Sequence, residues 1–482
     1  MLFNSIDFAV FFPIVFAIYW LINKYALRYQ NIFLLVASYV FYGWWDWKFL
    51  SLIALSSVVD FIIGQQLVSA SNATARKILL SISLVVNLGM LGFFKYYNFF
   101  IENFSNAFTL LGGEISDMSL QIVLPVGISF YTFQTLSYTI DVYKGKIAPT
   151  KDAIAFFAFV SFFPQLVAGP IERASNLLPQ FYKKRVFEYS NSIEGLKQIL
   201  WGLFKKIVIA DNCADVVNHI FYNSADMNGS SLLLGGLFFA FQIYGDFSGY
   251  SDIAIGLSKL FGFTLMRNFA FPYFSRDIAE FWRRWHISLS TWFRDYLYIP
   301  LGGSAGGMKG RIRNTFIIFI VSGFWHGANW TFIVWGALNA LYFLPLLLMQ
   351  QNRKNLNVVG EGKLFPSIRE LISVVTTFGL TVIAWVFFRA ENVPHALSYL
   401  GGIFDVSVFQ SPVLLEDFNI YLIISLIIVM TIIEWLDRDA EFALQKLTNN
   451  WKRPIRYSFY YVVLIMVLWF SGKEQEFIYF QF

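Results

Sequence analysis

The chain has 482 residues, of which 57% are hydrophobic, 20% aromatic and only 14% charged, with a formal net charge of +5. A mean hydropathy of +0.56 excludes an ordinary soluble globular protein, because such proteins carry about 25% charged residues. The composition instead indicates an integral membrane protein. We expect no nucleic-acid partner.

Apolar segments recur from one end of the chain to the other, at lengths typical of membrane helices. The predicted spans are residues 8–22, 32–45, 49–63, 78–94, 122–140, 153–168, 232–255, 315–325, 330–348, 371–388, 420–435 and 457–470. We therefore expect an all-α, polytopic integral membrane protein with about 11 to 12 transmembrane helices. The whole chain, 1–482, is predicted to form a single integral-membrane domain.

Several of these segments are shorter than the roughly 20 residues that cross a bilayer. Short spans predict tilted, broken or re-entrant helices, which occur where protein or a water-filled cavity satisfies the backbone. We therefore expect interfacial and re-entrant helices around a central funnel.

The first apolar segment lacks the positively charged leader and the cleavage site of a signal peptide, so we expect it to remain as a membrane helix. Basic residues of the first half lie in alternate connections: Lys24 and Arg28, Arg76 and Lys77, then Lys144, Lys146 and Lys151. A basic-poor connection carries Glu102, Glu114 and Asp117. Since basic connections stay in the cytoplasm, the N-terminus is predicted outside the cell inner membrane.

Residues 245–313 mix acidic and basic side chains with many aromatic ones, and this region is too polar to face lipid. We expect amphipathic helices here, lying at the surface or folding into the protein. Their indole and phenol rings are then predicted at headgroup depth. These rings belong to Trp282, Trp285, Trp292 and Tyr296.

Two other segments carry basic residues. The glycine-rich stretch 302–313 predicts a flexible basic loop that attracts lipid headgroups or a phosphate-bearing donor. The segment 193–210, with Lys197, Lys205 and Lys206, is amphipathic, as is typical of an interfacial helix.

Two of the four histidines lie in unusual settings. His286 belongs to the charged, aromatic-rich region, and His326 stands between two strongly apolar stretches with Gly323 and Gly327 nearby. A neutral imidazole can take a proton from a hydroxyl near neutral pH, so His326 is a candidate general base. Glycines on either side let the chain or a substrate come close. The alternative is a histidine that hydrogen-bonds between helices.

The remaining histidines, His219 and His395, are predicted to be solvated. His286 and His326 lack neighbours at the spacing of zinc ligands, so we predict no metal site and no bound cofactor. The single cysteine, Cys213, is predicted to serve helix packing.

A series of long motifs runs along the chain. They are LPVGISFYTFQTLSYTIDVYKG (124–145), FFPQLVAGPIERA (162–174), GDFSGYSDIAIGLSKLFGF (245–263), FWRRWHISLSTWFRDYLYIPLGG (281–303), FWHGANW (324–330) and WVFFRAE (385–391). Together they resemble the membrane-bound O-acyltransferase family, and within it the branch that O-acetylates bacterial alginate. The resemblance spans nearly the whole chain.

The resemblance implies O-acyl transfer at a histidine inside a membrane funnel. It makes His326 the catalytic residue, whereas His286 helps to position the donor or the acceptor. Other motif positions that we expect to bind substrate are Asp246, Tyr250, Asn268 and Arg294. The chemistry also needs a donor to the developing oxyanion, for which Asn329 and Trp330 are candidates.

The resemblance further implies a cytoplasmic acyl donor, either acetyl-CoA or a carrier-protein thioester. The acceptor is a polysaccharide hydroxyl outside, reached directly or through a separate periplasmic acetyltransferase. Alternatives within the family are D-alanyl transfer to teichoic acid from a carrier protein, and peptidoglycan O-acetylation. The non-enzyme alternative is a transporter or flippase, which fits the hydropathy and the broken helices equally well.

Overall fold

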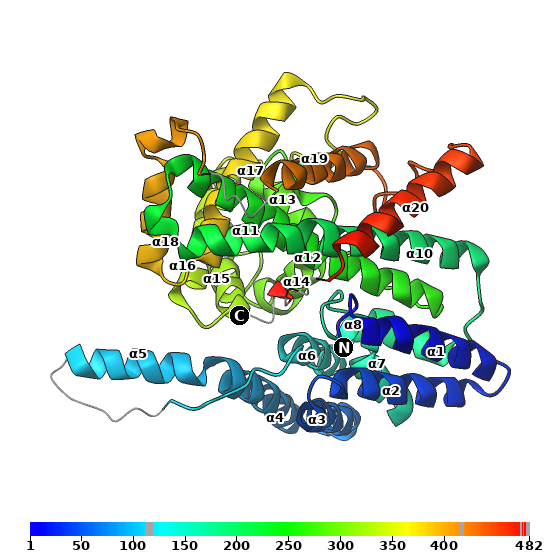
Figure 1. Cartoon of the computed structure of the whole chain (residues 1–482). Coiled ribbons are helices and arrows are strands. Elements are labelled where there is room, and N and C mark those ends of the chain that lie inside the picture. The colour runs from blue at the N-terminus through cyan, green and yellow to red at the C-terminus, as the bar shows by residue number, and fades with distance from the viewer. Residues whose placement is uncertain (111–118, 414–418, 473–474, 476, 479–482) are drawn as a thin grey trace. The chain divides into compact units, whose positions relative to one another are not determined.

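The computed structural model describes residues 1–110, 119–413, 419–472, 475 and 477–478. Glu114 and Asp117, which contributed to the predicted topology, lie outside the described residues. Within the described part, the chain forms helices joined by turns and contains no strand (Figure 1), which confirms the all-α prediction. The contacts divide it into unit 1, residues 1–192 and 257–266, and unit 2, residues 193–256 and 267–482. The single domain stays a prediction.

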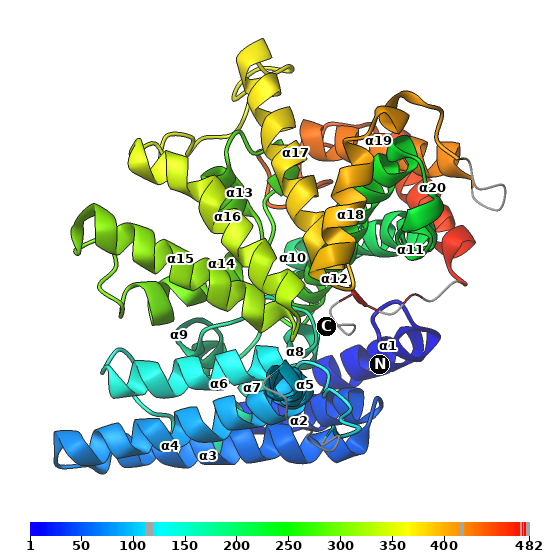
Figure 2. The same cartoon turned by 90° about the vertical axis from the view of Figure 1, so that its left-hand side faces the viewer.

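Unit 1 is built from short and medium helices. They are α1 (Ile6–Ile22), α2 (Leu27–Gly43), α3 (Leu50–Ser69), α4 (Ala73–Leu91), α5 (Tyr97–Leu110), α6 (Ile128–Tyr143), α7 (Ala153–Ser161), α8 (Phe163–Leu166) and α9 (Ala174–Leu177). Helices α3 and α4 lie side by side (Figure 2), and both pack on α6. Asp60 of α3 accepts hydrogen bonds from Asn87 of α4 and Thr139 of α6, at 2.8 and 2.9 Å. Such bonds hold helices together where apolar burial gives little driving force.

Unit 2 contains the remaining helices. They are α10 (Tyr189–Leu203) and α12 (Gly229–Leu260), which fall mainly in this unit, α11 (Asp211–Tyr222), α13 (Ile278–Arg284), α14 (Ile287–Phe293), α15 (Gly307–His326), α16 (Trp330–Leu348), α17 (Ile368–Arg389), α18 (Val393–Ile403), α19 (Ile420–Leu436) and α20 (Arg453–Phe470). A π-helical turn, η4 (Phe204–Ala210), joins α10 to α11. Helices α15 and α16 form a closely packed hairpin, and α17 packs against α16 (Figure 2).

Every predicted span overlaps at least one helix. Among the described residues, 5 helices are long and apolar enough to cross a membrane: Trp47–Ser69, Ala73–Leu110, Gly229–Leu260, Trp330–Leu348 and Ile368–Arg389. Shorter apolar helices are Ile6–Ile22, Ala153–Leu166 and Ile420–Leu436. The other predicted spans are helices that are shorter or more polar than these five. The fold is therefore that of a polytopic membrane protein.

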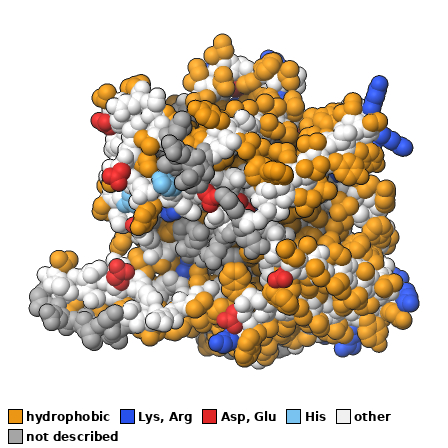
Figure 3. Space-filling model, viewed as in Figure 1, with side chains coloured by type: hydrophobic (Ala, Val, Ile, Leu, Met, Phe, Trp, Pro, Cys, Tyr) orange, Lys and Arg blue, Asp and Glu red, His pale blue; other side chains and the backbone are white. Residues whose placement is uncertain are grey.

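Large apolar side chains cover much of the surface, as the orange atoms in Figure 3 show. On α1, Val10, Ile14 and Leu21 share one face, and all are more than half exposed. On α20, Ile465 and Trp469 are also exposed. Soluble proteins rarely expose such continuous apolar surface, so these faces fit a lipid environment.

The structure differs from the predicted elements at three places. The helix expected over 122–140 begins only at Ile128, because Pro125 and the left-handed Gly127 (φ 74°) precede it. The segment 153–168 breaks at Phe162, as expected for a short span. Helix α15 begins at Gly307, so the basic residues of 309–313 lie on its first turns and not in a loop.

Paired glycines bring α10 and α12 into backbone contact. A Cβ atom at Gly249 would lie 2.7 Å from the carbonyl oxygen of Gly202, and one at Gly256 would lie 2.5 Å from that of Gly195. These distances are too short for any side chain. The two helices therefore require glycine at these crossings, as small-residue interfaces in membranes do.

We predict that Gly249→Ala lowers the thermal unfolding midpoint of the detergent-solubilised protein, because the added methyl forces the two helices apart. Overpacking of this kind costs about 1–3 kcal/mol. The matched control is Gly89→Ala on α4, where an added Cβ meets nothing within 4 Å. If Gly249→Ala and Gly89→Ala had the same unfolding midpoint, the close contact between α10 and α12 would be contradicted.

Candidate active site

His326 is the last residue of α15, and its side chain is buried, with 3% of the residue exposed. Aromatic rings surround it: Trp325, Trp335 and Phe388 have ring centroids 4.9, 5.1 and 5.2 Å from the imidazole centroid. Trp335 belongs to α16 and Phe388 to α17. The ring thus lies inside unit 2, where these three helices meet.

Glycines set the position of this histidine. A Cβ atom at Gly323 would overlap the carbonyl oxygen of Phe332, and one at Gly336 would overlap that of Phe319. A Cβ atom at Gly327 would overlap the Phe332 ring. The expectation that glycines beside His326 permit close approach is confirmed for the chain itself. The backbone of α16 occupies the space they leave.

His286 lies between α13 and α14, with its backbone in the left-handed region at φ 42°. This conformation is uncommon for a residue with a side chain and is often found at functional sites. The backbone of the next residue is tied down, because Ile287 N donates to Asn268 O at 2.9 Å. The histidine is therefore held in a defined orientation.

Asn268 determines the tautomer of His286. Its Oδ1 lies 3.1 Å from His286 Nδ1 and accepts from Ser288 Oγ at 2.9 Å, while its Nδ2 donates to Ser251 Oγ at 3.0 Å. Since a carbonyl oxygen only accepts, Nδ1 of His286 carries the proton and Nε2 carries the lone pair. Burial lowers the pKa of His286 to about 3, so the ring is neutral at physiological pH.

Trp325 connects the two histidines. Its ring centroid lies 6.2 Å from that of His286 and 4.9 Å from that of His326. The structure thus brings His286, Asn268 and His326 into one buried aromatic site. Sequence reasoning missed Trp335 and Phe388, which lie in other helices. For Phe388, the sequence signal was its place in the motif at 385–391; Trp335 lies in none of the motifs.

Asp246 and Tyr250 lie next to this site on α12, in a buried charge cluster. Lys206 Nζ lies 2.7 Å from both Asp246 and Asp211, and the backbone N–H of Ile478 donates to Asp246 at 2.7 Å. The Tyr250 ring lies beneath Lys206. Between them, Phe247 contacts the His286 ring, with centroids 4.6 Å apart. The cluster thus fixes the part of α12 that packs on His286, and substrate binding by Asp246 or Tyr250 stays a prediction.

The end of segment 193–210 is buried in the protein, whereas the predicted interfacial position of the segment stays a prediction. Lys205 pairs with Asp252 at 2.6 Å, and Lys206 is only 1% exposed. Both ammonium groups lie inside unit 2 because carboxylates of α12 and α11 compensate their charge there. Cys213 on α11 is buried, as predicted for helix packing.

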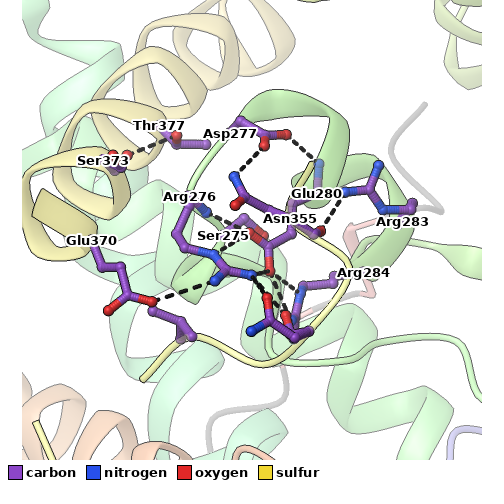
Figure 4. Close-up of polar contacts among 12 residues, drawn as sticks. Ser275, Arg276, Asp277, Glu280, Arg283, Arg284, Asn355, Glu370, Ser373 and Thr377 are labelled. Atoms are coloured by element: carbon purple, nitrogen blue, oxygen red, sulfur yellow. Dashed lines mark hydrogen bonds and ion pairs between the residues drawn. The ribbon is translucent and has the colours of Figure 1, made fainter. Parts of the chain in front are cut away.

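The arginines around α13 serve mainly to hold chain segments together (Figure 4). Glu280 pairs with Arg276 at 3.0 Å and with Arg284 at 2.8 Å. Arg283 donates to the backbone oxygens of Asn352 and Asn355, both at 2.7 Å, and so anchors the connection after α16. The ring of Trp285 is buried in the protein core beside these residues and so does not face lipid, while its predicted headgroup depth stays a prediction.

A cavity of about 810 Å³ lies between α13, α14, α15 and α16. Its apolar lining includes Leu289, Phe293, Ile318, Phe319, Phe343 and Leu347. Its guanidinium groups come from Arg283, Arg294, Arg311 and Arg353. Arg294, a predicted site residue, therefore lies at this cavity, where it pairs with Asp295 at 2.7 Å. The volume is that of a small-molecule binding site.

The cavity ends one helical turn before His326. Ser322 lines it, and residues four apart lie on the same helix face, so Ser322 and His326 share a side of α15. The indole of Trp282 separates the two, since it lines the cavity and lies 5.6 Å from the Trp335 ring. Its Nε1 donates to Asn339 Oδ1 at 3.2 Å, which holds it in place.

Asn329 and Trp330 follow the histidine. The Asn329 side chain caps α16 by accepting from Thr331 N at 3.0 Å, and its Nδ2 donates to Glu391 O at 2.8 Å. The Asn329 amide thus ties the turn after His326 to the end of α17. Trp330 is 54% exposed. An oxyanion-binding role for either residue stays a prediction.

His219 and His395 are half-buried and line one cavity of unit 2, where they were expected simply to be solvated. Among the residues that the structure describes, no group of three or more His, Cys, Asp or Glu side chains is placed to hold a metal ion.

Comparison with known proteins gives consistent matches. The profile of the membrane-bound O-acyltransferase family matches residues 147–383. A probable alginate O-acetylase of Pseudomonas aeruginosa is 42% identical over 412 residues, which cover 85% of this chain and 76% of that protein. A peptidoglycan O-acetyltransferase of Helicobacter pylori is 36% identical, covering 83% and 79%. A teichoic acid D-alanyltransferase of Streptococcus thermophilus is 30% identical over 45% of this chain and 55% of its own length.

We predict that Lys206→Met strongly destabilises unit 2, because it leaves two buried carboxylates without their cation. Breaking a buried pair in this way costs about 3–5 kcal/mol. Thermal unfolding and elution of the detergent-solubilised protein measure the loss. The control is Lys446→Met, which removes an exposed pair with Asp439 and should change little. Equal stability of the two variants would contradict a structural role of the cluster.

Proposed function

The chain belongs to the membrane-bound O-acyltransferase family, and we propose that it moves an acetyl group from a cytoplasmic thioester towards polysaccharide hydroxyls outside the cell inner membrane, with His326 as catalytic residue. Membership makes it a multi-pass membrane O-acyltransferase, so the transporter and flippase alternatives are set aside. The observation that carries the proposal is the place of His326. It is buried one helical turn beyond a cavity with a basic rim.

The basic rim supports a donor that enters from the cytoplasm. Basic residues concentrate at the start of α15 and in the connection after α16, and such segments stay on the cytoplasmic side. They include Lys309, Arg311, Arg313, Arg353 and Lys354. Guanidinium groups bind phosphate oxygens well, and the apolar lining suits the uncharged arm that carries a thioester. The donor is acetyl-CoA or an acylated carrier protein; the same rim chemistry serves both.

The reaction needs one proton acceptor. The acceptor oxygen attacks the thioester carbonyl carbon while His326 takes the hydroxyl proton, so that a C–O bond forms and the C–S bond breaks. The proton then passes from the imidazolium to the departing thiolate. General-base assistance of this kind contributes about 10²- to 10⁴-fold to the rate.

We assign His286 a positioning role. Its proton on Nδ1 is committed to Asn268, and its ring packs on Trp325, the direct neighbour of His326. A shift of the His286 ring therefore moves the wall against which donor and acceptor must align. Misplacement of reacting groups by about 1 Å can cost 10²-fold in rate.

The relatives favour acetyl over D-alanyl as the transferred group. The alginate and peptidoglycan O-acetylating relatives match more than four fifths of this chain, whereas the D-alanyltransferase matches less than half. We therefore rank polysaccharide O-acetylation first, acting directly or through a periplasmic acetyltransferase partner. Peptidoglycan O-acetylation and D-alanyl transfer to teichoic acid are the alternatives.

We predict that His326→Ala abolishes release of labelled acetyl from acetyl-CoA or an acetylated carrier, with a loss of about 10²-fold or more because the base is removed. The assay uses the purified protein in liposomes, and elution from a sizing column checks the fold. Lys446→Ala is the exposed control. Full activity of a folded His326→Ala protein overturns the assignment, and use of a D-alanylated carrier in place of both acetyl donors favours the competitor.

We predict that Asn268→Ala lowers kcat by about 10²-fold, because His286 loses the acceptor that orients it. Asn268→Asp keeps an oxygen acceptor at the same place and should recover part of the loss. If Asn268 has a purely structural role, the kcat of each variant should instead fall in proportion to its loss of thermal stability. Parallel measurement of kcat and the unfolding midpoint separates the two.

A further inference from the structure

A second cavity of unit 2, of about 570 Å³, lies where the C-terminal ends of α11 and α17 meet the start of α18. The function proposed above does not use it. Among the residues that line it, Tyr222 is 84% exposed, and Asn223 and Glu391 are close by. An aromatic ring in the open, next to amide and carboxylate groups, is unlike the apolar surfaces that fit lipid.

The cavity has few charged groups, with one more carboxylate than guanidinium. Asp215 and Glu391 supply two carboxylates, and Arg389 supplies a guanidinium. Arg389 is already engaged, since it donates to Asn218 Oδ1 at 2.8 Å and lies over the Phe221 ring. Recognition here therefore rests on hydrogen bonds more than on net charge.

The cavity that contains the exposed ring is lined by side chains that donate and side chains that accept hydrogen bonds. The half-buried His395 is held in the wall, because its Nε2 lies 3.1 Å from Ser224 Oγ and its Nδ1 accepts from Glu391 N at 3.4 Å. Amides, carboxylates and imidazoles bind hydroxyl groups in either direction. A sugar ring has a face of C–H groups for stacking and a rim of hydroxyls, and so complements such a cavity. Histidine and acidic side chains both reach the face of the molecule that Figure 3 shows.

The cavity is linked to His326 through neighbouring residues of the chain. Phe388 packs on the His326 ring at 5.2 Å, and the next residue, Arg389, lines the cavity. The backbone oxygen of Glu391 also accepts the hydrogen bond from Asn329, in the turn directly after His326. The donor cavity touches α15 only before His326, at residues 311–322. The donor cavity thus ends one helical turn before His326, whereas the second cavity is linked to His326 through the end of α17.

We propose that this second cavity is a carbohydrate subsite, which holds a sugar unit of the acceptor on the exposed ring of Tyr222. The inference rests on the proposed function, because it assigns the acceptor side of the same reaction. The bound unit is recognised by stacking and by its hydroxyls, with Glu391 and Asn223 as hydrogen-bonding partners. A neighbouring unit of the same polymer then lies near His326.

The test uses the full-length protein in nanodiscs with labelled acetyl-CoA and two acceptor probes, a hexauronate and a neutral hexaglucoside. Tyr222→Ala should raise the KM for the preferred oligosaccharide about tenfold, because stacking is lost. Glu391→Gln, which keeps the shape, should raise it severalfold. Neither variant should raise the KM for acetyl-CoA. The control is Tyr421→Ala, which changes another tyrosine that is 70% exposed but lies outside the cavity.

Unchanged acceptor KM values for Tyr222→Ala and Glu391→Gln overturn the subsite. The subsite is also overturned if the two variants lose acetyl transfer only in the presence of a periplasmic acetyltransferase. The second cavity would then be a binding surface for that protein. If the wild-type protein acetylates neither probe, saturation-transfer NMR measures oligosaccharide binding directly. A signal lost in Tyr222→Ala then supports the subsite while the proposed function fails, and equal signals overturn the subsite.

Discussion

The close approach of α15 to α16 determines where His326 lies. Lipid competes for apolar side chains as well as another helix does, so helices in a membrane associate through tight packing and polar contacts. At Gly323 and Gly336 the two backbones touch, with no space for a Cβ atom. This contact fixes the end of α15 against α16, and it places the imidazole beside Trp335 of the partner helix. A wider crossing would remove the aromatic wall of the site.

Buried charge performs a similar task on the other side of the site. Helix α12 presents Phe247 and Ser251 to the pair formed by His286 and Asn268. The ion pairs of Lys205 and Lys206 hold that helix to α10 and η4, together with the glycine contacts. A buried ion pair adds little net stability, but loss of one partner is costly. The cluster therefore favours one register of α12, and with it one position of His286.

The two ends of α15 have different surroundings. Its first turns carry basic residues at the rim of the larger cavity, which we propose as the donor site. Its last residue, His326, is enclosed by Trp325, Trp335 and Phe388. The residue after Phe388, Arg389, lines the second cavity, which is rich in hydrogen-bonding groups. Aromatic rings exclude water, and in the reaction we propose they would protect the thioester from hydrolysis and strengthen each hydrogen bond to the reacting groups.

The sequence alone determined the helices and the candidate histidines, because a run of apolar residues has few structures other than a helix in lipid, and because an imidazole between apolar segments is unusual. It did not determine the neighbours. Lys206 pairs with carboxylates from α11 and α12, and Phe388 reaches His326 from a separate helix. Periodicity reports which face of a helix is apolar, whereas the partner of that face depends on packing between segments far apart in the chain. Only the tertiary structure therefore decided that Asn268 orients His286 and that aromatic rings from three helices enclose His326.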